Sequence, residues 1–103
     1  MSDVKLKTRH LLIAGPVAAQ AFGEAAQVYV HYVAGQELLL APMDHESFSK
    51  SYKSALQMLK TRNLQGDKSI SLQEILIDHD LSDEDRDLSF TYDAPARVLH
   101  VIL

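Results

Sequence analysis

Three basic residues near the N-terminus are spaced so that an extended chain would carry them on one face. Lys5, Lys7 and Arg9 alternate with uncharged residues. Because successive side chains of a strand point to opposite faces, a strand here would present three cations in a row. Such a row suits phosphate groups, and a two-stranded β-ribbon can enter the major groove of DNA. The alternative is an edge strand whose charges protect it against aggregation.

The charges divide unevenly along the chain. The formal net charge is −4, but residues 1–68 hold eight of the ten basic residues and six of the fourteen acidic ones. Residues 69–103 are therefore strongly acidic, above all in the run from Ser82 to Asp87. Phosphate neutralisation supplies most of the affinity for nucleic acid, so we expect any DNA contact in the first part. The acidic part favours a solvated surface or a basic protein partner.

Motifs for catalysis and for metal binding are absent from the sequence. The chain has no cysteine, and its five histidines lack the His-x-x-x-His spacing. Asp78, His79 and Asp80 come nearest to a ligand cluster, but three adjacent residues of a helix cannot face one point. The glycines are too scattered for a phosphate-binding loop, and there is no Gly-x-Ser-x-Gly elbow. We expect no enzyme activity, no catalytic residue, no metal and no cofactor.

Length and composition indicate one domain over residues 1–103. An apolar content of 47% excludes a disordered chain and is sufficient for a core. The charged N-terminus lacks the apolar region of a secretory signal, and no apolar run reaches the roughly 18 residues of a membrane helix. We expect a soluble cytoplasmic protein without membrane association.

The order of elements expected in the first part recurs in the second. In the first part it is a strand, a small helix opened by Pro16 and closed by Gly23, and two strands joined by a turn. These elements cover residues 11–13, 15–22, 28–33 and 37–41, with the turn at 34–36. In the second part the same order covers a strand through Leu72, a helix to about His79, the acidic turn 82–87 and strands at 88–92 and 98–103.

The spacings of matching residues support an internal repeat. Leu38 follows Tyr32 by six positions, and Val98 follows Tyr92 by six. The second helix is expected to begin with a capping box formed by Ser71 and Glu74. We therefore predict two copies, at about residues 5–42 and 64–103.

One longer amphipathic helix is expected between the copies, at about residues 44–62. Asp44 is a suitable N-cap. Five apolar residues follow at helical spacing and would form a core-facing stripe: Phe48, Tyr52, Ala55, Leu56 and Leu59. On this prediction Lys50, Lys53 and Lys60 lie on a solvated face.

The two copies resemble the swapped-hairpin family typified by AbrB, MazE and MraZ. The residues that carry the resemblance are Ser69-Ile70-Ser71-Leu72, then Leu81, then the alternating stretch from Leu88 to Tyr92. Two copies with a helix between them are most similar to the MraZ arrangement. The resemblance implies an α+β fold in which two strand–helix–hairpin repeats interleave by their hairpins into one pseudo-twofold β core.

The same resemblance implies DNA binding through basic residues ahead of the first strand of each copy. Lys7 and Arg9 fit the basic positions of the first copy, and Lys68 takes the arginine position of the second. The family's aspartate is replaced by Lys5 and Leu64, and its glycine by Thr8 and Asp67.

Two functions are therefore expected as alternatives. One is a DNA-binding transcriptional regulator that uses Lys5, Lys7, Arg9 and Lys68 on double-stranded DNA. The other is a non-enzymatic interaction or assembly module that has lost DNA binding and contacts a basic protein through its acidic half. Both versions are expected to self-associate.

Overall fold

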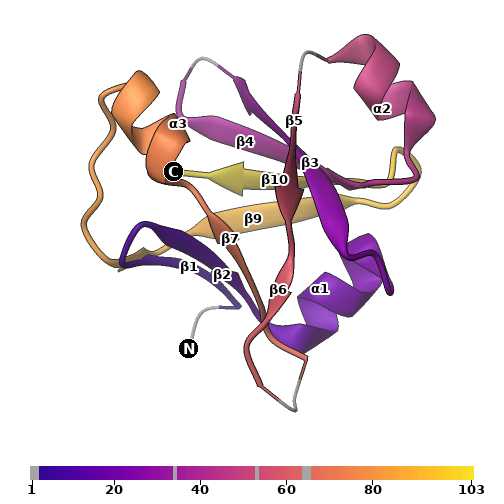
Figure 1. Ribbon diagram of the computed structural model, residues 1–103, viewed down its shortest axis with the longest axis horizontal. Coiled ribbons are helices and arrows are strands. Elements are labelled where there is room, and N and C mark those ends of the chain that lie inside the picture. Colours follow the sequence, from indigo (N-terminus) through magenta and orange to yellow (C-terminus); the bar gives the residue numbers. More distant parts are fainter. Residues whose placement is uncertain (1–2, 34, 53, 64–65) are drawn as a thin grey trace.

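A computed structural model describes residues 3–33, 35–52, 54–63 and 66–103 (Figure 1). Three of the positions discussed above, Ala34, Lys53 and Leu64, lie outside these residues. The described residues form two five-stranded antiparallel sheets and three helices, which confirms the expected α+β class. None of these helices is long and apolar enough to cross a membrane.

Sheet 1 contains the N-terminal strands. Its strands, in spatial order, are β6 (Lys60–Thr61), β7 (Lys68–Ser71), β2 (His10–Ile13), β1 (Val4–Lys7) and β8 (Arg86–Asp87). Strands β1 and β2 form a hairpin, and β2 pairs on its other side with β7, about 58 positions later in the chain. Residues far apart in the sequence therefore meet on one sheet.

Sheet 2 is built from two hairpins that pair with each other. Its order is β5 (Ala55–Met58), β3 (Gln27–Val33), β4 (Glu37–Pro42), β10 (Val98–Ile102) and β9 (Ser89–Asp93). The β3–β4 hairpin joins the β9–β10 hairpin through the pairing of β4 with β10. The strands expected at 28–33, 37–41 and 98–103 correspond to β3, β4 and β10.

Two bent segments connect the sheets at both of their borders. Residues 55–61 pair with β3 through β5 and with β7 through β6. Residues 86–93 pair with β1 through β8 and with β10 through β9. Each segment bends at a buried leucine, Leu59 or Leu88, whose N–H donates to the carbonyl of Ala26 or Val4 at 2.9 Å.

The main core lies between the facing surfaces of the two sheets. Alternate residues of β1 and β2 point inward, as do those of β3, β4 and β10, and their side chains are almost fully buried. The largest of them are Leu6, Leu11, Ile13, Leu38, Leu40 and Leu99. A second, smaller core on the outer face of sheet 2 contains Phe48.

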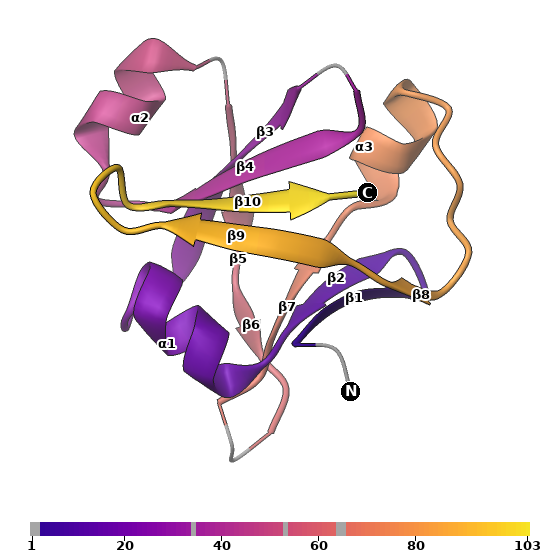
Figure 2. The same ribbon diagram turned by 180° about the vertical axis from the view of Figure 1, so that it is seen from behind.

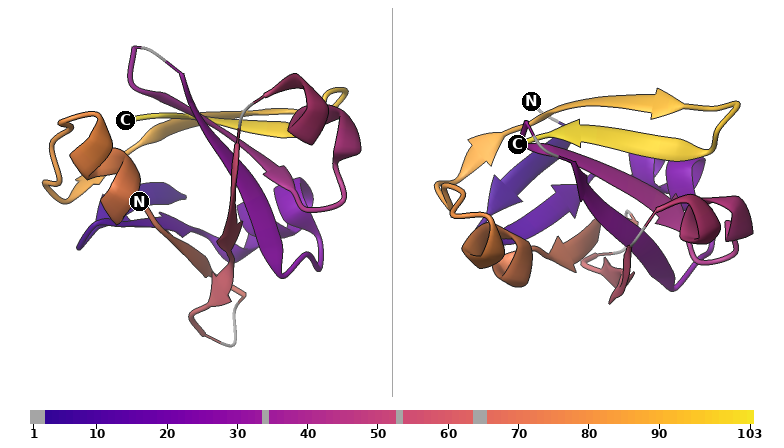
Figure 3. Two further views of the ribbon diagram at one scale, coloured as in Figure 1. Left: turned by 45° about the horizontal axis from the view of Figure 1, so that its top comes forward. Right: turned by 90° about the horizontal axis from the view of Figure 1, so that it is seen from above.

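The three helices cover different parts of this β structure. Helices α1 (Gly15–Phe22) and α3 (Gln73–Asp78) lie at opposite ends of the molecule, and α2 (Glu46–Ser51) packs on the outer face of sheet 2 (Figure 3). Helix α1 matches the prediction, with Pro16 in its first turn and Gly23 at its C-cap, where φ is +60°. Its residues Val17, Ala18, Ala21 and Phe22 enter the main core.

The long helix expected at about 44–62 is wrong. Only Glu46–Ser51 are helical, and residues 55–58 and 60–61 are strands. The reason lies in the tertiary structure. This segment pairs with one side of β3 through β5 and with one side of β7 through β6, and both pairings require it to be extended. Of the predicted stripe, only Phe48 and Leu59 are buried, whereas Tyr52 and Leu56 are 40% and 44% exposed.

The expected caps of α2 and α3 also differ. His45, not Asp44, caps α2: its Nε2–H donates to the Ala96 carbonyl at 2.7 Å, so Nδ1 is left to accept from the Phe48 N–H. Ser71 ends strand β7, and α3 has no side-chain cap. The Leu72 N–H instead donates to the Arg9 carbonyl, which holds the start of α3 against the turn between β1 and β2.

Candidate nucleic-acid interface

Strand β1 presents two of the predicted DNA-binding residues on the outer face of sheet 1. Val4 and Leu6 point into the core and are at most 1% exposed, so Lys5 and Lys7 point outward, where both are exposed. The alternation expected from the sequence is thus present in this strand.

A third lysine, Lys60, for which the helical pattern predicts a solvated helix face, shares this surface. Lys5 pairs with Leu12, Leu12 with Ser69, and Ser69 with Lys60. Residues paired directly across antiparallel strands point to the same face, so Lys60 lies with Lys5 on the outer face. The position of Lys60 depends on the pairing of β6 with β7. The sequence predicted a helix for this segment, so it did not predict this pairing.

Arg9 lies outside the strand, and the expected row of three cations on one strand is therefore wrong. Strand β1 ends at Lys7, and Thr8 and Arg9 form the tight turn to β2 with φ of +50° and +63°. Positive φ at both central residues is typical of two-residue hairpin turns, although glycine or asparagine usually occupies them. The turn places Arg9 at the hairpin tip.

An acidic segment lies against this hairpin tip. We call residues 82–87 the acidic strap; it descends from α3 along one border of the molecule to β8 (Figure 2). Its Asp83 Oδ2 accepts from Arg9 Nε at 2.9 Å, and its Asp85 Oδ1 accepts from the Thr8 main-chain N–H at 2.9 Å. The sequence indicated a solvated turn, and the residues are indeed exposed, but their carboxylates bind the cationic hairpin.

The strap continues beside β1 through its C-terminal residues. Strand β8 pairs with β1, which sets Asp87 directly opposite Lys5. Charges of opposite sign on paired residues attract each other, so the strap also offsets part of the charge of the outer face. The acidic and basic parts of the chain, separate in the sequence, are therefore neighbours in the fold.

Arg86, the basic residue of the strap, binds main-chain carbonyls. Its guanidinium donates to the carbonyls of Ser82 at 3.1 Å and Glu84 at 2.9 Å. It also donates to the carbonyl of Leu103 at 3.4 and 3.2 Å. Arg86 thereby shapes the strap and ties it to the C-terminus.

Lys68, the fourth predicted residue, does not join the other lysines. It pairs with Ile13 and Thr61, so it lies on the opposite face of sheet 1 from Ser69 and Lys60. Its Nζ donates to Thr61 Oγ1 at 2.6 Å. A face formed by Lys5, Lys7 and Lys60 thus excludes Lys68.

Asp67 caps helix α1. Its Oδ1 accepts from the Gly15 N–H at 2.7 Å, and its Oδ2 accepts from Asn63 Nδ2 at 3.0 Å. The Asn63 side-chain bond and then the Gly15 bond hold the pKa of this carboxyl below its ordinary value. Helix α1 has no cap from its own neighbours, so this distant residue replaces one.

Among the described residues, no three histidine, aspartate or glutamate side chains are grouped as a metal site. His79, the centre of the nearest sequence cluster, stacks on Tyr32 with ring centroids 3.9 Å apart and nearly parallel planes. His100 contacts Glu37 at 2.7 Å on the outer face of sheet 2. His79 and His100 therefore contact different residues on different parts of the molecule.

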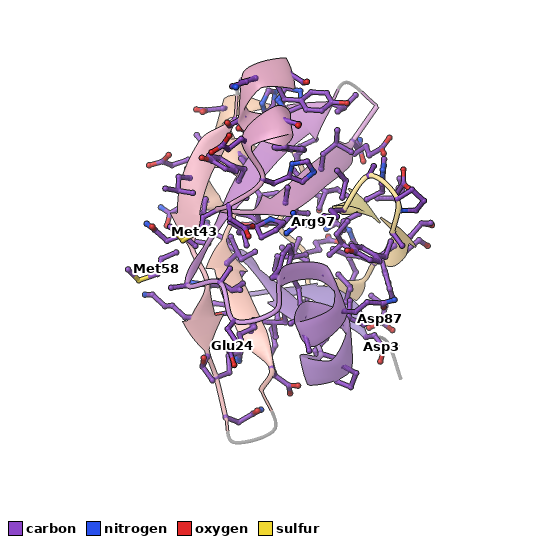
Figure 4. All side chains as sticks on the ribbon, turned by 90° about the vertical axis from the view of Figure 1, so that its right-hand side faces the viewer. Asp3, Glu24, Met43, Met58, Asp87 and Arg97 are labelled. Atoms are coloured by element: carbon purple, nitrogen blue, oxygen red, sulfur yellow. The ribbon has the colours of Figure 1, made fainter. Side chains whose placement is uncertain are left out.

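Two of the open grooves on the described surface adjoin residues discussed above. One of about 500 Å³ runs between α1 and the β9–β10 turn, bordered by Glu24, Met43 and Arg97 (Figure 4). Arg97 is paired there with Asp44 at 3.2 Å. The other, of about 310 Å³, lies where β5 and β7 diverge, beside the outer lysines, and includes Lys60 in its lining. Its remaining residues are His10, Gln57, Met58, Ser69 and Ser71.

Comparison with protein-family models, with curated proteins and with solved structures found no match to the chain. Any function must therefore be argued from this geometry and from the resemblance of the sequence pattern.

Proposed function

We propose that the chain is a DNA-binding protein of the regulator type and that it binds through the outer face of sheet 1. The observation that carries the proposal is that Lys5, Lys7 and Lys60 are exposed on one face although they come from distant parts of the chain. Lysines are point charges that neutralise phosphates, which provides affinity independent of sequence.

The size of this face suits a duplex. Lys5 and Lys60 are three strands apart, which corresponds to about 14 Å at the usual spacing between strands. The major groove is about 12 Å wide, so cations at the two borders of the face can reach phosphates on both sides of it.

The interleaving of two repeats is part of the proposal. Its support is two pairings, β2 with β7 and β4 with β10, each of which joins a strand of one proposed copy to a strand of the other. Each half supplies strands to both sheets, so neither half buries its apolar residues alone.

A protein-interaction module that binds a basic partner is the second candidate. The observation favouring it is that the acidic strap offsets charge on the proposed DNA face, while Glu84 within the strap and Asp78 and Asp80 shortly before it remain exposed. Self-association remains a prediction for both candidate functions.

Fluorescence anisotropy with a labelled mixed-sequence duplex at several salt concentrations tests the DNA proposal. We expect affinity to fall with salt, and the Lys5→Gln/Lys7→Gln variant to lower the slope of log K against log salt by about two. Lys50→Gln, on helix α2, removes a lysine from another surface and should leave the slope nearly unchanged.

Absence of duplex binding by the wild-type chain at low salt, together with binding of a basic peptide, would replace the DNA proposal by the second candidate. Equal slopes for the three proteins would show that binding uses another surface.

A further inference from the structure

The hairpin tip already holds two anions. Asp83 binds the Arg9 guanidinium and Asp85 binds the Thr8 main-chain N–H, each at 2.9 Å. A main-chain N–H in a tight turn and an adjacent guanidinium are also the donors that proteins use for phosphate oxygens. The two carboxylates therefore stand where phosphate oxygens of a bound strand could be held.

We propose that the acidic strap is an internal competitor of DNA: Asp83 and Asp85 occupy the hairpin tip in the free protein and leave it when phosphates bind. This inference rests on the proposed DNA function and adds its regulation. The exposed lysines Lys5, Lys7 and Lys60 contact the duplex first. Arg9 becomes available to a phosphate only after the duplex has displaced the strap.

The strap contacts are of a kind that a duplex can displace. The side chains of Arg9 and Asp83 are each 52% exposed, and ion pairs so exposed are weak and screened by salt. A duplex offers a dense row of phosphates to the same donors, so it competes favourably with two carboxylates.

The chain on either side of the strap allows this displacement without unfolding. Residues 82–85 form neither helix nor strand. Before them the Leu81 N–H is anchored to the Leu76 carbonyl, and after them β8 is paired with β1. The two contacts with the tip can open while both anchors remain.

The Asp83→Asn/Asp85→Asn variant tests the inference by duplex titration at low salt. We expect it to bind about three- to tenfold more tightly than the wild-type chain, because the negative charges of the two competing side chains are removed. Asp83→Asn alone keeps the contact of the Asp85 carboxylate with the Thr8 N–H, so its affinity for the duplex should rise less than that of the double variant.

Two controls separate local competition from net charge. Glu24→Gln/Glu46→Gln makes the same change in net charge on surfaces away from the hairpin; Glu24 lies well apart from Asp87 in Figure 4. Glu84→Gln removes a strap charge whose side chain makes neither tip contact. We expect each control to gain less than the Asp83→Asn/Asp85→Asn variant.

The possible failures are distinguishable. If the affinity of the Asp83→Asn/Asp85→Asn variant for the duplex rises no more than that of the Glu24→Gln/Glu46→Gln control, the strap does not compete with DNA. The proposal of DNA binding itself still stands in that case. If no variant binds duplex, the DNA proposal and this inference both fail. If the strap variant loses helical and strand circular dichroism, Asp83→Asn alone decides, and an unchanged or weakened affinity for it overturns the inference.

Discussion

At the scale of single residues, the clearest long-range determinant is the carboxylate of Asp67. It caps helix α1 from 52 positions away, through the 2.7 Å bond with the Gly15 N–H. Ala14, the residue before the helix, has no side-chain acceptor, so the N-terminus of α1 depends on this contact. A negative charge there also interacts favourably with the helix dipole.

This cap predicts a pH dependence of stability. Because the folded-state pKa of Asp67 is below its ordinary value, its contribution is complete above about pH 4 and is lost as pH falls through the folded pKa. We expect Asp67→Asn to have a lower free energy of unfolding than the wild type near neutral pH, and the difference to shrink in acid.

Urea unfolding followed by circular dichroism over this pH range measures the difference, with the exposed Glu24→Gln as control. A difference that is constant with pH would contradict the role of the Asp67 charge.

At the scale of elements, the segment 55–61 shows how pairing overrides periodicity. Its apolar residues fit a helix, but each neighbouring strand gains a hydrogen-bonded partner only if the segment is extended. The bend between its two short strands is fixed by Leu59, which is buried and bonded to Ala26. Hydrophobic pattern alone does not distinguish these states when the segment is short and lacks glycine or proline.

The two leucines of this segment should respond differently to truncation. We expect Leu59→Ala to lower the free energy of unfolding by about 2–5 kcal/mol, because Leu59 is 6% exposed within the core. Leu56→Ala should cost less than about 1 kcal/mol, because Leu56 is 44% exposed. Chemical denaturation of both variants measures this; equal costs would indicate that the two leucines share one buried helix face.

At the scale of the whole molecule, stability is expected to be highest where the two halves meet. Strands β4 and β10 are flanked by partners on both sides, and their inward residues Leu40, Leu99 and Val101 are fully buried. The two-residue strands β6 and β8 lie at the borders of sheet 1. Local opening is easier at such borders than in the centre of a sheet.

Hydrogen exchange should reproduce this gradient. We expect the hydrogen-bonded amides of β4 and β10 to exchange at least about a hundredfold more slowly than those of β6 and β8. Amide exchange followed by NMR measures the rates. Similar rates in β4 and β6 would mean that the hairpin–hairpin junction is not the most stable part of the fold.

Much of the local structure could be predicted from the sequence. Pro16 and Gly23 bound α1, and alternation of side chains marks the exposed and buried sides of β1 and of the first part of β3, because these signals act within a few residues. In the candidate site, the alternation of β1 identified Lys5 and Lys7 as residues of one exposed face. Lys60 was assigned to the wrong element, and the partner of the Arg9 side chain could not be predicted, because Asp83 lies 74 positions away.

By itself, then, the sequence determined helix α1 and the extended segments of β1 and of the two hairpins, but not the strands within residues 55–61. Tertiary structure alone decided that Lys60 faces the same way as Lys5, that Lys68 faces the other way and that the acidic strap lies on the hairpin tip. The physical reason is that strand register and ion pairing depend on which distant segments meet, and that choice is made by burial of the common core.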